Sequence, residues 1–208
     1  MSNAVALNLP FVQDYEGIAP QLAGAGIGWL DELRRAALGR YSVQGLPGPR
    51  TEAWKYTNLN IARRKAFKTA FEGSSAPPMS IPEGVLKIDS VNLVLVNGRF
   101  SPELSDLGNL PGGIYVSSFN KAIEDKNLDF ISIFDTSIAG HDMPMMDLNT
   151  AFLNDGLVIV VKKGYHIDIP LHVISIGTPG NEAIAFHSRN ILSVERGASI
   201  TILSLIHI

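Results

Sequence analysis

The chain has 208 residues, of which 46% are hydrophobic and 18% are charged, and its formal net charge is -3. This composition supplies enough apolar surface for one or two domains with a packed core, which excludes general disorder. There is no cysteine, so disulfide bonds and thiolate metal sites are excluded as well. Because Lys and Arg are not in excess, we expect no nucleic-acid partner.

Nothing in the sequence indicates a membrane protein. The N-terminus, MSNAVALNLPFVQDYEG, has neither the basic nor the apolar part of a secretory signal. The longest apolar run, Leu157 to Val161, is far too short to span a bilayer. We therefore expect a cytoplasmic protein with no membrane partner. The densest basic cluster, Arg63-Arg64-Lys65, is typical of a solvated helix face.

Residues 1–72 are expected to form an N-terminal helical region. A helix is predicted where apolar residues recur every three or four positions, namely at Trp29, Leu30, Leu33, Ala36, Ala37 and Tyr41. The Gly- and Pro-rich residues 45–49 end this helix. Thr51 is predicted to cap a short helical turn that carries Glu52, and residues 61–70 are predicted to continue as helix.

A linker is predicted at residues 73–84, where small residues and prolines are concentrated. The following segment, 85–147, is expected to mix strands and helices. Apolar residues alternate from Val91 to Leu95, which predicts a strand, and Asn97-Gly98 predicts a hairpin turn after it. A second strand is predicted at Ile114 to Val116, and then a short helix from Phe119 to Lys126 with Ser117 or Ser118 as its cap.

Short strands separated by glycine are predicted from residue 148 onward. They cover Leu157 to Val161, Ile167 to Val173, Ile191 to Val194 and a last strand that begins at Ile200. Because no helices lie between them, these strands belong to sheets rather than to βαβ units. A β-sandwich and a β-helix both fit, and the absence of a strict short repeat leaves the two open.

Two stretches of this sequence resemble the SufB/SufD family, and more closely its SufD branch. The first is GLPGPRTEAWKYTNL, in which the residues that carry the resemblance are Pro47 or Pro49, Arg50, Glu52, Trp54, Lys55, Tyr56, Thr57 and Leu59. The second is LNTAFLNDGLVIVVKKGYHIDIP, with Leu148, Asn149, Thr150, Ala151, Asp155, Gly156, Lys163, Gly164 and Pro170, followed by Leu171 and His172. The strings His187-Ser188-Arg189-Asn190 and Asn97-Gly98-Arg99-Phe100-Ser101 fit further family elements, although proline is more usual at position 188.

The resemblance implies an α+β fold: an N-terminal helical region followed by the first coils of a right-handed parallel β-helix, which starts at residues 148–202. It implies a non-enzymatic scaffold subunit of the SUF iron–sulfur cluster assembly system. Such a subunit pairs with a SufB-type subunit through the β-helix and binds a SufC-type ATPase through a C-terminal domain. The full complex handles the Fe-S cluster, and no cofactor is expected on these residues. The family's cluster-proximal residue falls beyond Ile202, so no catalytic, cofactor-binding or metal residue is assigned.

The last residues, 203–208 (LSLIHI), depart from the family pattern and match a translated sequencing-adapter string. We expect them to be a non-native tail at an artificial end of the reading frame, so His207 is given no functional weight.

Several side chains are of types that can bind metals or ligands, and for each of them we expect a structural role instead. His166 and His172 lie six apart and are expected to be outward-facing strand residues rather than a metal pair. The methionines after His141-Asp142, from Met143 to Met146, are expected to fill the core rather than bind a soft metal. Trp54 and Tyr56 are expected to anchor their loop against the helical region.

The remaining polar motifs are also interpreted structurally. Arg50 and Glu52 are expected to form a loop-fixing ion pair. The glycines from Gly24 to Gly28 are followed by Trp29 and lack the lysine of a phosphate-binding loop, so ATP binding is not expected.

Two other functions compete with the scaffold. A β-helix carbohydrate-active enzyme would need clustered carboxylates, yet the acids from 157 to 202 are only Asp168, Glu182 and Glu195. The other is a SufB-type paralogue with the same assembly role.

Overall fold

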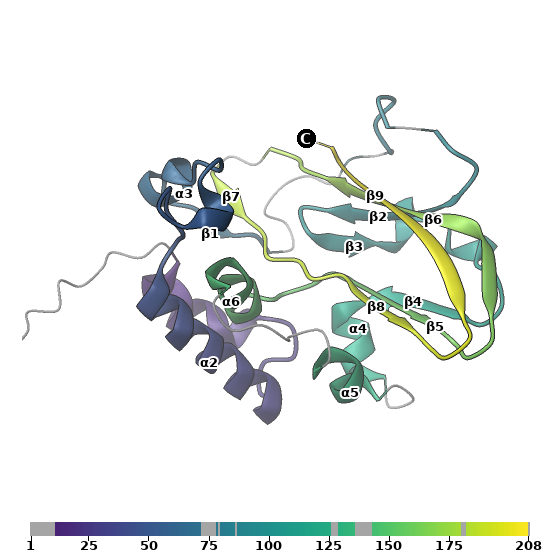
Figure 1. Cartoon of the computed structure of the whole chain (residues 1–208), viewed down its shortest axis with the longest axis horizontal. Helices are drawn as coiled ribbons and strands as arrows, with labels where there is room; N and C mark the ends of the chain where they lie inside the picture. The colour runs from purple at the N-terminus through teal and green to yellow at the C-terminus, as the bar shows by residue number, and fades with distance from the viewer. Residues whose placement is uncertain are drawn as a thin grey trace, which may run out of the picture. The chain divides into compact units, whose positions relative to one another are not determined.

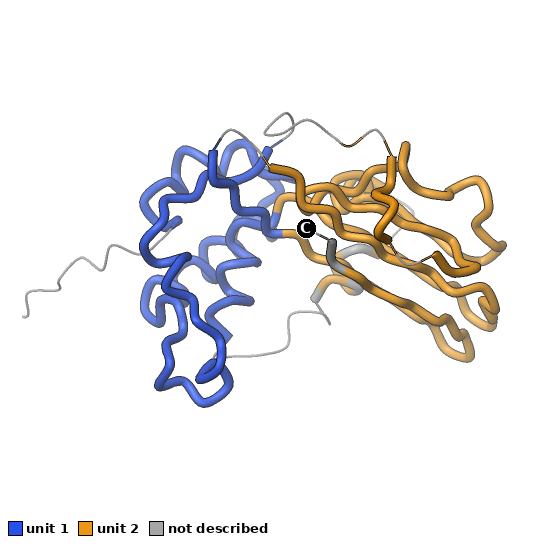
Figure 2. Tube along the Cα trace, turned by 90° about the horizontal axis from the view of Figure 1, so that it is seen from above, with its two compact units in different colours: residues 1–71, 140–153, 181–187 blue, residues 72–139, 154–180, 188–208 orange. Residues whose placement is uncertain are grey.

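The computed structural model describes residues 11–71, 78, 80–85, 87–125, 129–135, 143–179 and 182–207. The chain divides into two compact units, each built from three separate stretches of sequence (Figure 2). Unit 1 comprises residues 1–71, 140–153 and 181–187, and unit 2 comprises residues 72–139, 154–180 and 188–208. The division into five consecutive segments that the sequence suggests stays a prediction.

Unit 1 is mainly helical. Its helices are η1 (Val12–Asp14), α1 (Tyr15–Ile18), η2 (Ala19–Gln21), α2 (Gly28–Gln44), η3 (Glu52–Trp54), α3 (Asn60–Arg64) and α6 (Pro144–Ala151). Strands β1 (Lys68–Thr69) and β7 (Ile184–Ala185) form a short parallel pair. The helix predicted over residues 61–70 is therefore wrong beyond Arg64. Lys65 has extended backbone angles, and the Lys68 N–H donates to the Ala183 carbonyl instead of to a helical partner.

Helices α2 and α6 lie side by side and enclose the core of unit 1 (Figure 1). The stripe that α2 buries recurs every three or four residues, as predicted, and consists of Leu30, Arg34, Ala37 and Tyr41. The buried residues are not all those expected, because Ala36 is exposed and Arg34 is buried. Phe152, Leu148 and Tyr15 complete this core from the other elements of the unit.

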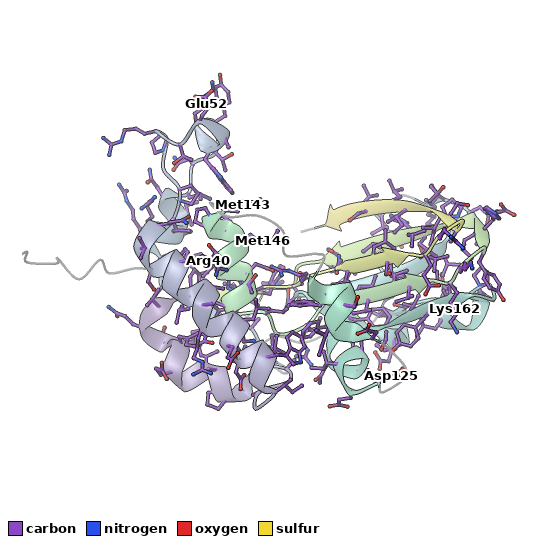
Figure 3. All side chains as sticks on the ribbon, turned by 60° about the horizontal axis from the view of Figure 1, so that its bottom comes forward. Arg40, Glu52, Asp125, Met143, Met146 and Lys162 are labelled. Carbon is purple, nitrogen blue, oxygen red and sulfur yellow. The ribbon has the colours of Figure 1, made fainter. Side chains whose placement is uncertain are left out.

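Arg40 on α2 joins the two helices at their polar edge (Figure 3). Its Nη2 atom lies 2.7 Å from the Asp147 carboxylate on α6, and its Nε atom donates to the same oxygen at 2.8 Å. The paired geometry satisfies a carboxylate that is almost fully buried.

Unit 2 contains two larger sheets. One has the strand order β3-β2-β6-β9 and the other the order β4-β5-β8. Their bounds are β2 (Val91–Val96), β3 (Arg99–Ser101), β4 (Ile114–Ser118), β5 (Leu157–Val161), β6 (His166–Ile176), β8 (Ile191–Val194) and β9 (Ser199–His207). The helices of this unit are η4 (Pro102–Leu104), η5 (Leu107–Asn109), α4 (Phe119–Glu124) and α5 (Phe130–Asp135).

The main core of unit 2 lies between the two sheets. Alternate residues of the strands point into it, among them Leu93 from β2, Ile159 from β5 and Leu171 from β6. The other face of the sheet β4-β5-β8 is covered by α4 and α5 (Figure 1), where the Phe119 and Phe134 rings lie 5.8 Å apart. This explains why every residue of β5 is buried.

The local predictions for unit 2 are confirmed in detail. Asn97 and Gly98 both have positive φ angles and join β2 to β3 as an antiparallel hairpin. The helix after β4 begins at Phe119, and the Ser118 side chain caps it by accepting from the Lys121 N–H at 3.2 Å. Each predicted strand from 157 onward is present, although β6 extends as far as Ile176.

The fold is α+β, as predicted. Both larger sheets mix parallel and antiparallel pairs, so the sheets by themselves show no more than this mixed fold, and the predicted right-handed parallel β-helix is not shown. The physical reason is local: the Asn97-Gly98 turn forces β3 back along β2, and β4 runs antiparallel to β5. The parallel pairs join strands that are distant in sequence. Val158 lies opposite Ile191, and His166 lies opposite Ser199. Within the described part of the chain, no helix has the length and apolar character to cross a membrane.

Candidate functional site

The loop that follows α2 forms a pocket on unit 1. Gly45 ends the helix with a φ of 68°, and its N–H donates to the Tyr41 carbonyl at 2.7 Å. The next residues, Leu46 and Pro47, are buried, and Leu46 belongs to the core. The loop is therefore anchored at its first residues and becomes exposed from Pro49 onward.

Arg63 fixes this loop from α3. Its Nη2 atom donates to the carbonyl oxygens of Leu46 and Pro47, the latter at 3.0 Å. The sequence assigned Arg63 to a solvated helix face. All three residues of the cluster are exposed, but Lys65 lies beyond the helix, and the interpretation misses the bonds that Arg63 makes to the loop.

We call the resulting concavity the Arg50 pocket. It is open to solvent, has a volume of about 500 Å³, and is lined by Gln44, Gly45, Leu46, Pro47, Gly48, Pro49, Arg50, Thr51, Arg63 and Pro144. Three prolines give it rigid apolar walls, and the two arginines are its only charged lining residues. The pocket is therefore positive and suited to an anionic group.

Trp54, Lys55 and Tyr56 follow the pocket in the sequence, and Lys55 and Tyr56 are exposed. Tyr56 is 91% exposed and Trp54 is half-buried. The short turn η3, marked by Glu52 in Figure 3, extends away from α2 and α6 of the same unit. The expectation that both aromatic rings anchor the loop is therefore wrong for Tyr56, because nearly all of its surface is exposed. Instead the Lys55 Nζ atom lies over it, 5.1 Å from its centroid.

Glu52 pairs with Lys55 and not with Arg50. The Lys55 Nζ atom lies 2.5 Å from Glu52 Oε1, and both side chains are well exposed, so this ion pair adds little to stability. Arg50 has no ion-pair or hydrogen-bond partner among the described residues. Between positions 50 and 65 there are five basic residues and one acidic residue, although the whole chain is net negative.

The second motif, Asp155-Gly156, meets the Ser188-Arg189-Asn190 string in unit 2. Asp155 and Ser188 form a parallel bridge, and the Arg189 N–H donates to the Asp155 carbonyl at 3.1 Å. The Asn190 side chain accepts from the Leu157 N–H at 3.1 Å. These contacts join the start of β5 to the start of β8, so the two motifs serve the alignment of strands.

Asp155 and Arg189 are buried in this junction, whereas Asn190 is exposed. The Asp155 carboxylate accepts from the Phe100 N–H at 3.2 Å, and burial raises its pKa although backbone donors and the Arg99 charge act in the opposite direction. Burial lowers the pKa of Arg189 to about 10, and its guanidinium lies 5.7 Å from the Phe134 ring. These groups hold the fold together and leave no open surface for a substrate.

His187 packs in the aromatic core of unit 1. Its ring lies 5.4 Å from that of Phe11 and 5.3 Å from that of Phe152. The residue as a whole is half-buried, but its Nε2 atom is shielded from solvent and has no hydrogen-bond partner among the described residues. This burial lowers the pKa of His187 to about 4.

Stability is therefore expected to fall as the pH is lowered. In the unfolded chain His187 takes up its proton near pH 6.5, and in the folded chain only near pH 4, so the unfolded state binds more protons between these values. The free energy of unfolding should decrease by about 1–2 kcal/mol between pH 7 and pH 5 from this group. Urea titrations at both pH values measure it. The loss should largely disappear in His187→Phe and persist in His166→Asn, and an unchanged pH dependence in His187→Phe would contradict the assignment.

The other candidate side chains do not converge. His166 is exposed, with its Nδ1 atom 2.8 Å from Ser199 Oγ, whereas His172 is fully buried. The expectation that both face outward is wrong for His172, and the register of β6 against β9 is irregular between the two. Among the described residues no three His, Asp or Glu side chains gather where they could hold a metal ion.

The methionines and the glycine turn also have structural roles. Met145 packs against the core of unit 1, as expected, while Met143 is half-exposed, and His141-Asp142 lie outside the described residues. In the turn before α2, the Gly26 N–H donates to Asp31 Oδ2 at 2.9 Å. A carboxylate of the chain itself thus accepts from this turn.

The fold and the site together define an α+β protein that has two stacked sheets and a basic, aromatic loop beside an open pocket. The profile of the SufBD protein N-terminal region matches residues 5–173, and the chain belongs to this family. It is 26% identical over 161 residues to an iron–sulfur cluster assembly SufBD family protein of Synechocystis sp., covering 76% of this chain and 34% of that protein. It is 28% identical over 161 residues to the iron–sulfur cluster assembly protein SufD of Escherichia coli, covering 76% of this chain and 35% of that protein. The chain therefore matches about a third of the length of these relatives.

Proposed function

We propose that this chain is part of a non-enzymatic scaffold subunit of the SUF iron–sulfur cluster assembly system and acts in the cytoplasm. The observation that carries the proposal is the family match over residues 5–173, and the names of both relatives point to the same process. In this proposal the partners are a SufB-type subunit and a SufC-type ATPase. The Fe-S cluster is the cargo of the whole complex, and the described residues supply structure and binding surface.

We also propose that β5, β6, β8 and β9 are the first coils of a right-handed parallel β-helix through which the SufB-type subunit binds. The support is a repeat: β5 and β6 occupy neighbouring sheets, and β8 and β9 pair with them in parallel. The partners lie 33 residues later, as in Val158 with Ile191, or 31 residues later beyond the irregularity in β6, as in Leu171 with Ile202. Inward residues continue from one strand to the next, because Leu192 lies beside Ile159 and Ile200 beside Ile167.

This arrangement predicts that the chain self-associates. Strands β8 and β9 are the outer strands of their sheets, and the inward-facing Leu192 and Val194 are 49% and 42% exposed. Unpaired strand edges with apolar side chains favour pairing with other chains. Light scattering after size exclusion should show oligomers that Leu192→Lys together with Val194→Lys disperses. Val43→Lys, which changes an exposed side chain on α2, should not disperse them, and a monomeric wild-type chain would contradict the prediction.

The assembly role is tested by co-purification. The chain, extended by the coding sequence that follows it in the source genome, is co-expressed with the SufB-type and SufC-type proteins of the same source, and one partner carries the affinity tag. We expect all three to elute together and to accumulate an Fe-S cluster that is visible by absorption. Absence of the chain from the purified complex would refute the proposed function.

A further inference from the structure

We propose that the Arg50 pocket and the neighbouring Trp54–Tyr56 segment form a docking site for an acidic peptide segment of a partner protein, whose carboxylate binds Arg50. This inference uses the proposed function only in treating the chain as a subunit of an assembly. It concerns a surface of unit 1 that is formed mainly by residues 44–63.

The lining of the pocket selects an anion. None of the residues that line it is acidic, and its charged groups are Arg50 and Arg63. Arg63 already uses its Nη2 atom on two loop carbonyls, whereas Arg50 has no partner among the described residues. A guanidinium presents two parallel N–H donors that match the two oxygens of a carboxylate, so Arg50 is the group that remains available for an incoming acid.

The charges around the pocket strengthen this preference. Glu52, the one acidic residue between positions 50 and 65, is neutralised by Lys55 at 2.5 Å. Arg64 and Lys65 remain exposed nearby in the sequence. A positive surface on a chain of net charge -3 favours a negatively charged partner at this place.

The aromatic side chains indicate that the partner is a protein. Trp, Tyr and Arg are the residues that contribute most to protein–protein affinity, and here Trp54, Tyr56 and Arg50 follow one another within seven positions. Tyr56 exposes 91% of its surface. Single-stranded nucleic acid would stack its bases on such rings, but the Lys55 ammonium lies over a face of Tyr56. The rigid proline walls suit a side chain of a peptide better than a sugar–phosphate backbone.

Binding is measured by fluorescence anisotropy with this chain as it stands. The probe is a short fluorescein-labelled peptide in which Glu and Asp alternate with Leu, and its counterpart carries Gln and Asn at the acidic positions. We expect the acidic peptide to bind and its affinity to fall about tenfold in Arg50→Glu and severalfold in Tyr56→Ser, because a charge-assisted bond and a contact area are lost. Arg50→Lys should retain part of the affinity. Arg196→Glu, which makes the same charge change at an exposed position of unit 2, should leave it unchanged.

Other outcomes overturn the proposal. The carboxylate site would be refuted if the peptide with Gln and Asn bound as tightly as the acidic peptide, or if the acidic peptide did not bind. Equal losses of affinity in Arg50→Glu and Arg196→Glu would refute it as well. Tighter binding of a single-stranded RNA oligonucleotide would make the surface a nucleic-acid site. Self-association that Arg50→Glu disperses would assign it to a second copy of the chain. Cluster assembly is not part of this experiment, so its failure leaves the proposed function standing.

Discussion

Replacing Gly156 with alanine is expected to destabilise the chain by about 4 kcal/mol. A Cβ atom at this position would overlap the carbonyl group of Arg189, which is backbone and has no room to move because Arg189 also bonds to Asp155. The backbone of Gly156 also has a φ of 154°, a conformation that residues other than glycine rarely adopt. Steric overlap and backbone strain act together, which places the change among the largest effects of single substitutions.

Two other glycines of unit 2 separate these causes. Gly197 has a φ of 73° but open space around a Cβ, so Gly197→Ala should cost only the strain, about 1 kcal/mol. Gly108 has no positive φ, and no atom lies within 4 Å of where its Cβ atom would be. Gly108→Ala should therefore be close to neutral. Urea unfolding followed by circular dichroism gives the three values. If Gly156→Ala and Gly197→Ala cost the same, the contact with Arg189 is not what requires glycine at position 156.

These three glycine substitutions test what the Asp155-Gly156 motif contributes to the fold. Asp155, Gly156 and Arg189 lie where β5 and β8 begin, and their backbones approach closely enough to align the two strands. Any scaffold built from these strands depends on that alignment. The motif that carries the family resemblance thus acts through strand register, and mutations in it should act by destabilising unit 2 rather than by removing a chemical group.

The strands and turns of unit 2 could be predicted from the sequence because their signals are local. The alternation from Val91 to Leu95 reflects which face is buried, and Asn97-Gly98 fixes the hairpin through its own backbone angles. The end of α3 is different. Residues after Arg64 still favour a helix locally, but Lys68 pairs with β7, which lies more than a hundred positions further along the chain. A pairing between strands so far apart in the sequence cannot be predicted from the pattern of neighbouring residues.

The candidate site was only partly predictable. Its residues were singled out, but their roles were misjudged because burial was inferred from residue type. Tyr56 is aromatic and is expected to anchor its loop, yet it is exposed; Arg34 is charged, yet it is buried. In both cases the outcome depends on tertiary partners: the pocket loop carries Tyr56 away from the core, and two distant carbonyls provide a site for Arg34.

Removing the Arg34 side chain is the second change with a large expected effect. The residue is 1% exposed, and its Nη2 atom donates at 2.6 Å to the carbonyl oxygens of both Ala23 and Leu153. It thereby ties the loop before α2 to the end of α6, and burial lowers its pKa. Arg34→Ala would leave a cavity and a buried Leu153 carbonyl without this donor. We expect a loss of about 3–5 kcal/mol in the free energy of unfolding.

Two variants show whether the hydrogen bonds or the volume cause this loss. Arg34→Met keeps most of the volume without donors, so a loss of about 1–3 kcal/mol is expected from the unpaired carbonyl groups alone. Arg35→Ala removes an adjacent arginine that is exposed and bonds to the Asp31 carbonyl, and it should change stability by less than about 0.5 kcal/mol. If Arg34→Met is as stable as the wild type, packing and not the two carbonyl bonds keeps this arginine in the core. Equal losses in Arg34→Ala and Arg35→Ala would show that neither role applies, because an exposed arginine shares neither the burial nor the partners of Arg34.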